Sequence, residues 1–310
     1  MNSPKPSVRY IQVDDSSDGQ RIDNFMLKYC KGVPKSHIYK AIRSGQVRVN
    51  KGRVSSESRV KEGDEVRIPP FRVPEETPKN FIPSREFEVV FEDSYFLIIN
   101  KPAGLAVHGG SGVSFGVIEQ IRSSRPEHTY FELVHRLDKE TSGLLIIAKK
   151  RIGLVKLQEM MRQKHFHKAY YALVKGTWPA NLKDIKLPLF KYLTPQGERR
   201  VRVDMENGKY AHSIVKKVKK YNDFELLSVQ ILTGRTHQIR VHLRASGFGI
   251  VGDEKYGDDT LTKYVSSFEF NRMFLHAYKL SFVHPITDER LNFEIDLPDD
   301  CKTLLKKLGP

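Results

Sequence analysis

The most decisive stretch for the larger part of the chain is Val134–Ala148, which reads VHRLDKETSGLLIIA. A polar cluster with Asp138, Thr141 and Ser142 runs directly into the apolar run Leu144–Ala148, which is typical of a buried strand. A carboxylate at the entrance to such a strand is partly desolvated and needs a cation or hydrogen-bond donors to stay ionised. Asp138 is therefore either a site residue or the partner of a surface lysine in a capped turn.

Two segments further along the chain add candidate site residues. Residues 168–174, KAYYALV, predict a strand in which Tyr170 either packs in the core or forms a platform for a nucleic-acid base. Residues 232–242, LTGRTHQIRVH, predict a strand that passes into a helix, with Arg240 and Arg244 on one helix face. These cations could bind phosphates, or one of them could pair with a carboxylate from elsewhere.

The region before Val134 reads as a hairpin, a glycine-rich loop and a helix. Residues 87–91 and 95–99 predict the two strands of the hairpin, and residues 114–121 predict the helix. Between them, His108–Gly112 has neither the GxxxxGK[ST] nor the GxGxxG spacing of a phosphate-binding loop. We expect a flexible loop near a site, with no role assigned to it.

The N-terminal part is the most basic part of the chain. Residues 21–67 hold 12 Lys and Arg against 5 Asp and Glu, a net +7. Apolar spacing predicts helices over 21–29 and from about Ser36 to Gly45, followed by short strands over 46–50 and 65–68. Either the charges form an ordinary solvated face, or they bind nucleic acid. We expect RNA contacts from four cations on the second helix and the strand after it: Lys35, Lys40, Arg43 and Arg48.

Composition excludes several classes of protein. The 310 residues include 52 Lys and Arg against 37 Asp and Glu, a net charge of +15, which favours a polyanionic partner. Apolar runs are far shorter than the ~20 residues of a membrane helix, and we see no secretory signal. Two cysteines form no disulfide framework. We expect a cytoplasmic protein without a membrane partner, and a monomer, because no long heptad repeat is present.

The N-terminal segments resemble the S4 RNA-binding module. The similarity rests on RIDNFMLKY, on KSHIYKAIRSGQVRVNKGRV and on VKEGDEVRIP. In that family the two helices and the following strand and loop lie on folded RNA. The module accompanies many activities, so the resemblance implies a partner and not a reaction.

The remainder resembles the RluA family of RNA pseudouridine synthases, and within it the RluC branch that modifies large-subunit (23S) ribosomal RNA. The motifs are HRLDKETSGLLIIAKK, KAYYALVKG and LTGRTHQIRVHLRASGFGIVGDEKYG, with KPAGLAVHGGSG before them. The resemblance implies cofactor-free isomerisation of uridine to pseudouridine after the base is flipped out of the RNA. One departure is visible, because residues 208–213, GKYAHS, replace the usual small-residue run.

The resemblance also implies roles for single residues. Asp138 matches the catalytic aspartate, which acts either as a nucleophile at C1′ or as a base at C2′. Arg240 matches its basic partner, a guanidinium that can hold the carboxylate in a fixed fork. Tyr170 matches the tyrosine that stacks on the uracil and helps to remove the C5 proton. Four further cations match or extend the RNA-binding set: Arg136, which enters the space left by the base, Lys168, Arg235 and Arg244.

The predicted architecture is α+β, or mixed α/β, in two domains. We expect a flexible N-terminus over 1–18, an S4 domain over 19–68, a proline-rich linker over 69–85 and a catalytic domain over 86–310 with a mostly antiparallel central sheet. We also expect a mobile C-terminal tail. No metal site is expected, because His165 and His167 have no further ligands at metal spacing. Two other functions fit the sequence less well. A non-catalytic RNA-binding scaffold would not need the intact motifs, and a metal-dependent nuclease would need clustered carboxylates, which we do not find in the sequence.

Overall fold

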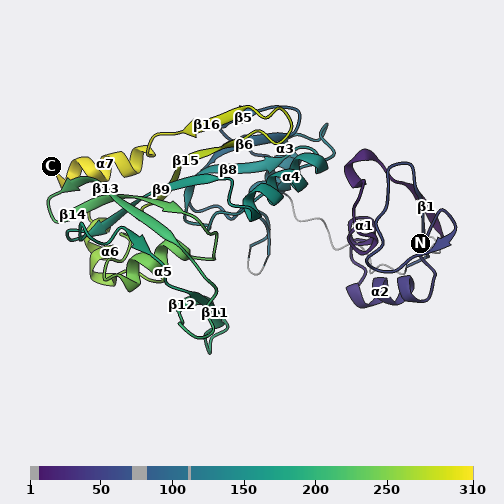
Figure 1. Ribbon diagram of the computed structural model, residues 1–310, viewed down its shortest axis with the longest axis horizontal. Coiled ribbons are helices and arrows are strands. Elements are labelled where there is room, and N and C mark those ends of the chain that lie inside the picture. The colour runs from purple at the N-terminus through teal and green to yellow at the C-terminus, as the bar shows by residue number, and fades with distance from the viewer. Residues whose placement is uncertain (1–6, 72–81, 111–112, 310) are drawn as a thin grey trace. The chain divides into compact units, whose positions relative to one another are not determined.

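The computed structural model describes residues 7–71, 82–110 and 113–309, which form two compact units shown in Figure 1. The main boundary between the units lies at Pro83 and Ser84. It falls within the linker expected over 69–85, of which residues 72–81 lie outside the described part of the chain. Within these described ranges, no helix is long and apolar enough to cross a lipid bilayer.

The first unit packs two helices on a four-stranded sheet in the order β1-β4-β2-β3. Its core contains Phe25 and Met26 of the first helix and Ile38 and Ile42 of the second, at the spacing of one helix face. The sequence therefore predicted both helices correctly. The elements are β1 (Arg9–Gln12), the short helix η1 (Asp15–Ser17), α1 (Ile22–Tyr29), α2 (Lys35–Arg43), β2 (Arg48–Val49), β3 (Gly52–Arg53) and β4 (Glu65–Ile68).

The expectation of a flexible segment over residues 1–18 is wrong for its second half. Strand β1 pairs antiparallel with β4, and Val13 and Ser17 are buried. The strand was missed because only Ile11 of its four residues is part of the apolar pattern, so its register is set by backbone hydrogen bonds to β4. Residues 1–6 lie outside the described part.

The second unit is built on a ten-stranded, mostly antiparallel sheet, as predicted. Eight strands follow the order β10-β13-β14-β9-β15-β8-β6-β5, with β16 paired to β15 and β7 to β8. Among the strands that the structure describes in this sheet, only β8 and β15 pair in parallel. The strands are β5 (Val89–Glu92), β6 (Phe96–Lys101), β7 (Glu132–Leu133), β8 (Ser142–Ala148), β9 (His167–Lys175), β10 (Asp184–Ile185), β13 (Ser213–Tyr221), β14 (Phe224–Ile231), β15 (Leu275–Val283) and β16 (Arg290–Glu294).

Helices and one hairpin complete this unit. Figure 1 shows the hairpin of β11 and β12 extending away from the large sheet near α5. The elements are α3 (Val117–Ser124), α4 (Arg151–Arg162), β11 (Leu189–Leu193), β12 (Arg199–Val203), α5 (Gln238–Ala245), α6 (Asp259–Ser266) and α7 (Asp299–Leu308).

Side chains of the central strand β9 alternate between the two faces of the sheet. Tyr170 and Ala172 belong to the core that includes α3 and α5, whereas Leu173 belongs to the core that includes α6 and α7. Tyr171 packs with the second core and stacks on Tyr278 with 3.7 Å between ring centroids. Because neighbouring residues in a strand point to opposite faces, Tyr170 and Tyr171 lie on different sides of the sheet.

A glycine allows the parallel pairing of β8 and β15. Gly143 has φ +113°, and a Cβ at this position would clash with the backbone of Ala277 on β15. The TSG part of the decisive stretch therefore has a structural reason, because only glycine combines this backbone conformation with such close strands.

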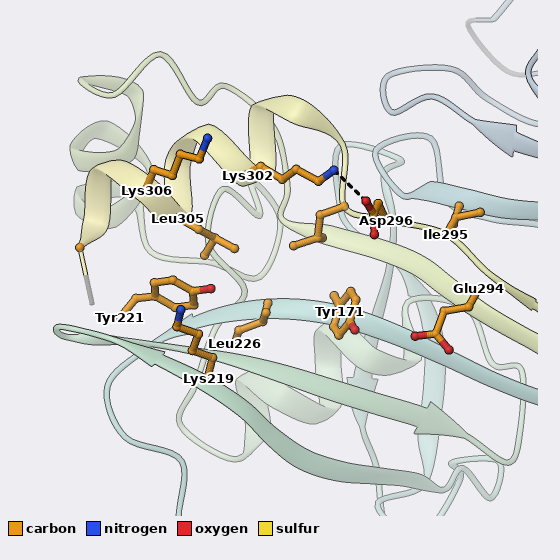
Figure 2. Close-up of a pocket in the computed structure, with 12 residues that line it drawn as sticks. Tyr171, Lys219, Tyr221, Leu226, Glu294, Ile295, Asp296, Lys302, Leu305 and Lys306 are labelled. Carbon is orange, nitrogen blue, oxygen red and sulfur yellow. Dashed lines mark hydrogen bonds and ion pairs between the residues drawn. The ribbon is translucent and has the colours of Figure 1, made fainter.

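The C-terminal segment is ordered, contrary to expectation. Helix α7 buries Cys301, Leu304, Leu305 and Leu308, whose spacing forms one apolar helix face. A pocket of about 590 Å³ lies between this helix and the Tyr171 face of the sheet. Figure 2 shows Lys302, Leu305 and Lys306 of α7 opposite Tyr171 and the β13–β14 side chains.

Candidate active site

Asp138 lies in the loop between β7 and β8, at the wall of a cavity of about 440 Å³. Its carbonyl oxygen accepts a hydrogen bond from the Thr141 backbone N–H at 3.1 Å, which closes the turn before β8. The Asp138 side chain is 22% exposed to solvent and faces the cavity. The lining includes His135, Arg136, Leu137, Asp138, Thr141, Met161, Arg162, Lys168, Tyr170, Ile231, Gly234, Arg235, Thr236, His237, Gln238, Ile239, Arg240 and Leu275.

Arg240 is the cation that reaches Asp138. It is buried on α5, and its Nη1 donates to Asp138 Oδ2 at 3.3 Å. The expected fork between these two residues is wrong, because the bidentate partner of Arg240 is Asp253. Nε donates to Asp253 Oδ2 at 2.7 Å and Nη2 to Asp253 Oδ1 at 2.6 Å. Burial lowers the pKa of Arg240, but the hydrogen bonds and charges of both carboxylates raise it above its ordinary value.

Tyr170 and Lys168 project from β9 into the same cavity, two positions apart on one face of the sheet. Burial raises the pKa of the Tyr170 phenol, and the charge of Asp138 raises it further. The phenol therefore stays protonated at neutral pH. Burial lowers the pKa of Lys168. Within the described ranges, no side chain or carbonyl pairs with its ammonium group, so Lys168 offers the cavity an uncommitted donor.

His135 joins the loop that carries Asp138 to β8. Its Nε2 accepts a hydrogen bond from the Ile146 backbone N–H at 3.1 Å, which requires the unprotonated nitrogen. Burial lowers the pKa of His135 to about 3, and the charge of Lys168 adds to this effect. The imidazole is therefore neutral and structural at ordinary pH.

Of the other RNA-binding residues predicted in this unit, two lie at the cavity and one lies away from it. Arg136 and Arg235 are exposed at the edge of the cavity. Arg235 Nε also donates to the Tyr210 carbonyl at 2.9 Å, so the unusual 208–213 segment positions this arginine. Arg244 is exposed further along α5 and does not line the cavity.

The predicted cations of the first unit lie on one helix and the adjoining strand. Lys35, Lys40 and Arg43 are exposed on α2. Arg48 is half-buried and donates to the carbonyl oxygens of Gly45 and Lys51, so part of its role is to hold the loop. The exposed set forms a basic surface that could bind phosphates.

Sequence reasoning missed three residues around Asp138. Asp253 is buried and holds Arg240, while His237 Nε2 lies 3.9 Å from Asp138 Oδ2. Tyr256 shares a hydrogen bond of 2.7 Å with His237 Nδ1. Asp253 and Tyr256 stand in GDEKYG, and nothing in that segment alone indicates that an acidic residue there pairs with a cation on α5. The described ranges contain no group of three His, Cys, Asp or Glu side chains arranged to hold a metal ion.

Comparisons with known proteins identify the families of both units. The RNA pseudouridylate synthase family model matches residues 95–245, and the S4 domain model matches residues 20–66. The chain is 46% identical over 308 residues to ribosomal large subunit pseudouridine synthase C of Haemophilus influenzae, covering 97% of this chain and 95% of the relative. The protein of that name from Escherichia coli K12 is 44% identical over 99% of both chains.

Solved structures share the fold of the second unit. The human RNA pseudouridylate synthase domain containing 4 matches with a TM-score of 0.58 and 23% identity, over 71% of this chain and 92% of the other. The human RNA pseudouridylate synthase domain containing 1 protein matches with a TM-score of 0.57 and 24% identity, over 72% of this chain and 94% of the other. The two family models and the relatives that match almost the whole chain lead to one conclusion: this chain is a pseudouridine synthase and belongs to the RNA pseudouridylate synthase family, with an N-terminal S4 domain.

Proposed function

We propose that this enzyme isomerises specific uridines of large-subunit (23S) ribosomal RNA to pseudouridine, with Asp138 as the catalytic carboxylate. The observation that carries the proposal is the pairing of Asp138 with Arg240, 102 positions apart in sequence, inside one cavity. The ribosomal target is supported by the names of relatives that are 44–46% identical over almost the whole chain.

The reaction needs an ionised carboxylate. The N1–C1′ bond of uridine breaks, the uracil turns, and C5 bonds to C1′. The C5 proton leaves and N1 gains a proton, so the product is an isomer. Asp138 acts either by attack on C1′ or by removal of the C2′ proton. In both routes Arg240 keeps the carboxylate charged, because a nearby cation stabilises the ionised form.

Tyr170 contributes its ring in this proposal. Its phenol stays protonated beside Asp138, so it is suited to contact the uracil face and not to remove a proton in the resting enzyme. Lys168, on the same face, has an unpaired ammonium group for a uracil oxygen or a phosphate.

The target uridine must leave its stack to enter the cavity, at a cost of a few kcal/mol. Arg136 at the cavity edge is placed to occupy the vacated space. Arg235 and Arg244 would bind backbone phosphates, as would Lys35, Lys40, Arg43 and Arg48 of the S4 domain. We further propose that the enzyme works as a monomer in the cytoplasm, without a membrane partner.

Tritium release tests the proposal directly. Large-subunit ribosomal RNA labelled at uridine C5 loses tritium to water when the new C–C bond forms. We expect release by the wild type, none by Asp138→Asn, and unchanged release by Glu140→Gln, which removes the same charge from the same loop. Equal RNA binding by all three proteins would separate chemistry from recognition. Release by Asp138→Asn at the wild-type rate would remove Asp138 from the mechanism.

The same assay tests the absence of a cofactor. The isomerisation consumes no water and transfers no electrons, so the residues of the cavity are sufficient in this proposal. We expect dialysis against a strong chelator to leave release from prefolded RNA unchanged. Loss of activity that zinc restores would overturn this part of the proposal.

A further inference from the structure

The two basic groups near Asp138 approach the same oxygen. Arg240 Nη1 lies 3.3 Å from Oδ2, and His237 Nε2 lies 3.9 Å from Oδ2. Among the residues that the structure describes, none donates a hydrogen bond to Oδ1. The carboxylate is therefore held on one side, with its other oxygen available to the cavity.

Asp253 determines which nitrogen of Arg240 remains for Asp138. It takes Nε and Nη2 in a fork, which leaves Nη1. Asp253 is itself fixed, because its Oδ1 also accepts hydrogen bonds from the backbone N–H groups of Lys255 and Tyr256. A planar guanidinium gripped along one edge by a fixed carboxylate has one orientation.

The turn is anchored as well as the side chain. Gly252 has φ +73°, and a Cβ there would clash with the carbonyl of Arg272. The backbone that carries Asp253 therefore packs directly against the segment before β15. The position of the Asp253–Arg240 fork therefore depends on the turn at Gly252 and on the segment at Arg272, in addition to α5.

Tyr256 determines how His237 faces Asp138. The Tyr256 oxygen accepts a hydrogen bond from the Val201 backbone N–H at 2.9 Å. The same oxygen shares a hydrogen bond of 2.7 Å with His237 Nδ1. We assign the Tyr256 O–H as the donor to Nδ1, which places the imidazole proton on Nε2, the nitrogen that faces Asp138. The Tyr256 ring also lies under the Arg240 guanidinium, 5.0 Å from centroid to Cζ.

We propose that Asp253 and Tyr256 are positioning residues that hold Arg240 and His237 against Oδ2 of Asp138, so that Oδ1 is the oxygen that reacts. The inference rests on the proposed role of Asp138. Without Asp253, Arg240 is free to fork both oxygens of Asp138 and cover the reactive one. Without the Tyr256 hydroxyl, His237 loses the hydrogen bond that fixes its tautomer.

A double-mutant cycle, with kcat as the measured quantity, tests whether Asp253 acts through Arg240. Asp253→Asn keeps the size of the side chain and removes the charge, and we expect kcat to fall about 100-fold with KM within about 3-fold, because small misplacements cost this much. Arg240→Lys cannot form the fork. If Asp253 acts through Arg240, the double variant loses no more than Arg240→Lys alone. Multiplied losses would show a separate, structural role and overturn the inference.

A second cycle keeps the proposal testable if Asp253→Asn does not fold. Tyr256→Phe keeps the ring, and its effect on kcat should vanish in a His237→Gln background. Independent losses there would contradict the tautomer argument. Asp258→Asn is the matched control, because Asp258 caps α6 two residues beyond Tyr256 and asparagine is an equally good cap. Its kcat should equal that of the wild type.

The outcomes also separate this inference from the proposed function. A wild type that releases no tritium would refute the proposed function without any reference to Asp253. An active wild type with additive cycles would refute only the positioning role. An active wild type with non-additive cycles, and full activity of Asp258→Asn, would support both.

Discussion

The Lys101 ammonium group donates to the carbonyl oxygen of Lys139, the residue that follows Asp138, at 3.1 Å. It also donates to the carbonyls of Pro102 and Leu105, both at 2.8 Å. Lys101 is fully buried at the end of β6. One buried side chain thus ties the loop after β6 to the loop that carries Asp138, 38 positions further along the chain, and burial lowers the pKa of its amine to about 7.

Lys101→Met should weaken both stability and activity. Three partly buried carbonyls would lose their donor, and each hydrogen bond contributes about 0.5–1.5 kcal/mol, so we expect a loss of about 3 kcal/mol in the free energy of unfolding. Urea titration measures this quantity. Lys139→Ala is the control, because it removes an exposed side chain and keeps the carbonyl. An unaltered unfolding midpoint for Lys101→Met would show that these hydrogen bonds do not support the loop.

Lys168→Met should stabilise the protein while it impairs catalysis. The variant replaces the ammonium group of a half-buried residue, which has no partner in the described part of the chain, with an apolar side chain of similar length, so the cost of desolvating the charge is removed. We expect a higher melting temperature together with slower tritium release. Lys175→Met, at the exposed end of β9, should change neither property. Wild-type activity in Lys168→Met would exclude the residue from the reaction.

His135 predicts a specific response to acid. Its pKa is about 3 in the folded protein and about 6.5 in an unfolded chain. Between these values the unfolded chain binds more protons, so the free energy of unfolding falls as pH decreases. From pH 7 to pH 5 this residue should cost about 2 kcal/mol. The difference between wild type and His135→Gln, measured by denaturant unfolding at both pH values, isolates the effect. A constant difference would mean that His135 does not stay neutral.

The exposed cations of α2 predict how RNA affinity depends on salt. If Lys40 and Arg43 each neutralise one phosphate, replacing both with alanine should reduce the slope of log K against log salt by about 1.4–1.8. Lys302→Ala with Lys307→Ala removes the same charge from α7, where both lysines already pair with carboxylates. That control should keep the wild-type slope in filter-binding titrations with ribosomal RNA. An unchanged slope for the α2 variant would leave this helix without a role in RNA binding.

Local patterns predicted the elements that carry the site. The decisive stretch gave the strand β8 and the loop with Asp138, and the alternation in KAYYALV placed Lys168 and Tyr170 on one face of β9. Periodicity is reliable here because each segment is buried along a face that its own sequence displays. The pairing of Asp138 with a cation on the helix over 238–245 was also foreseen, through the matching motifs.

Long-range pairing explains what was missed. Asp253 stands beside Glu254 in a polar turn, and only the folded chain reveals that Asp253 takes the fork expected for Asp138. Strand β1 has little apolar character and depends on its partner β4. Helix α7 displays its apolar face in the sequence, and it was missed because chain ends are usually mobile, whereas this one completes a core.

The position of β15 in the sheet has a consequence for synthesis of the protein. This strand lies between β9 and β8, yet it is made after both of them. While the chain emerges from the ribosome, the strands on either side of that gap have no partner at the middle of the sheet. Domains complete their folding only when all their parts are available. The second unit can therefore complete its central sheet only after residue 283 has left the exit tunnel, so the strands made earlier must wait for β15 before the site between them is finished.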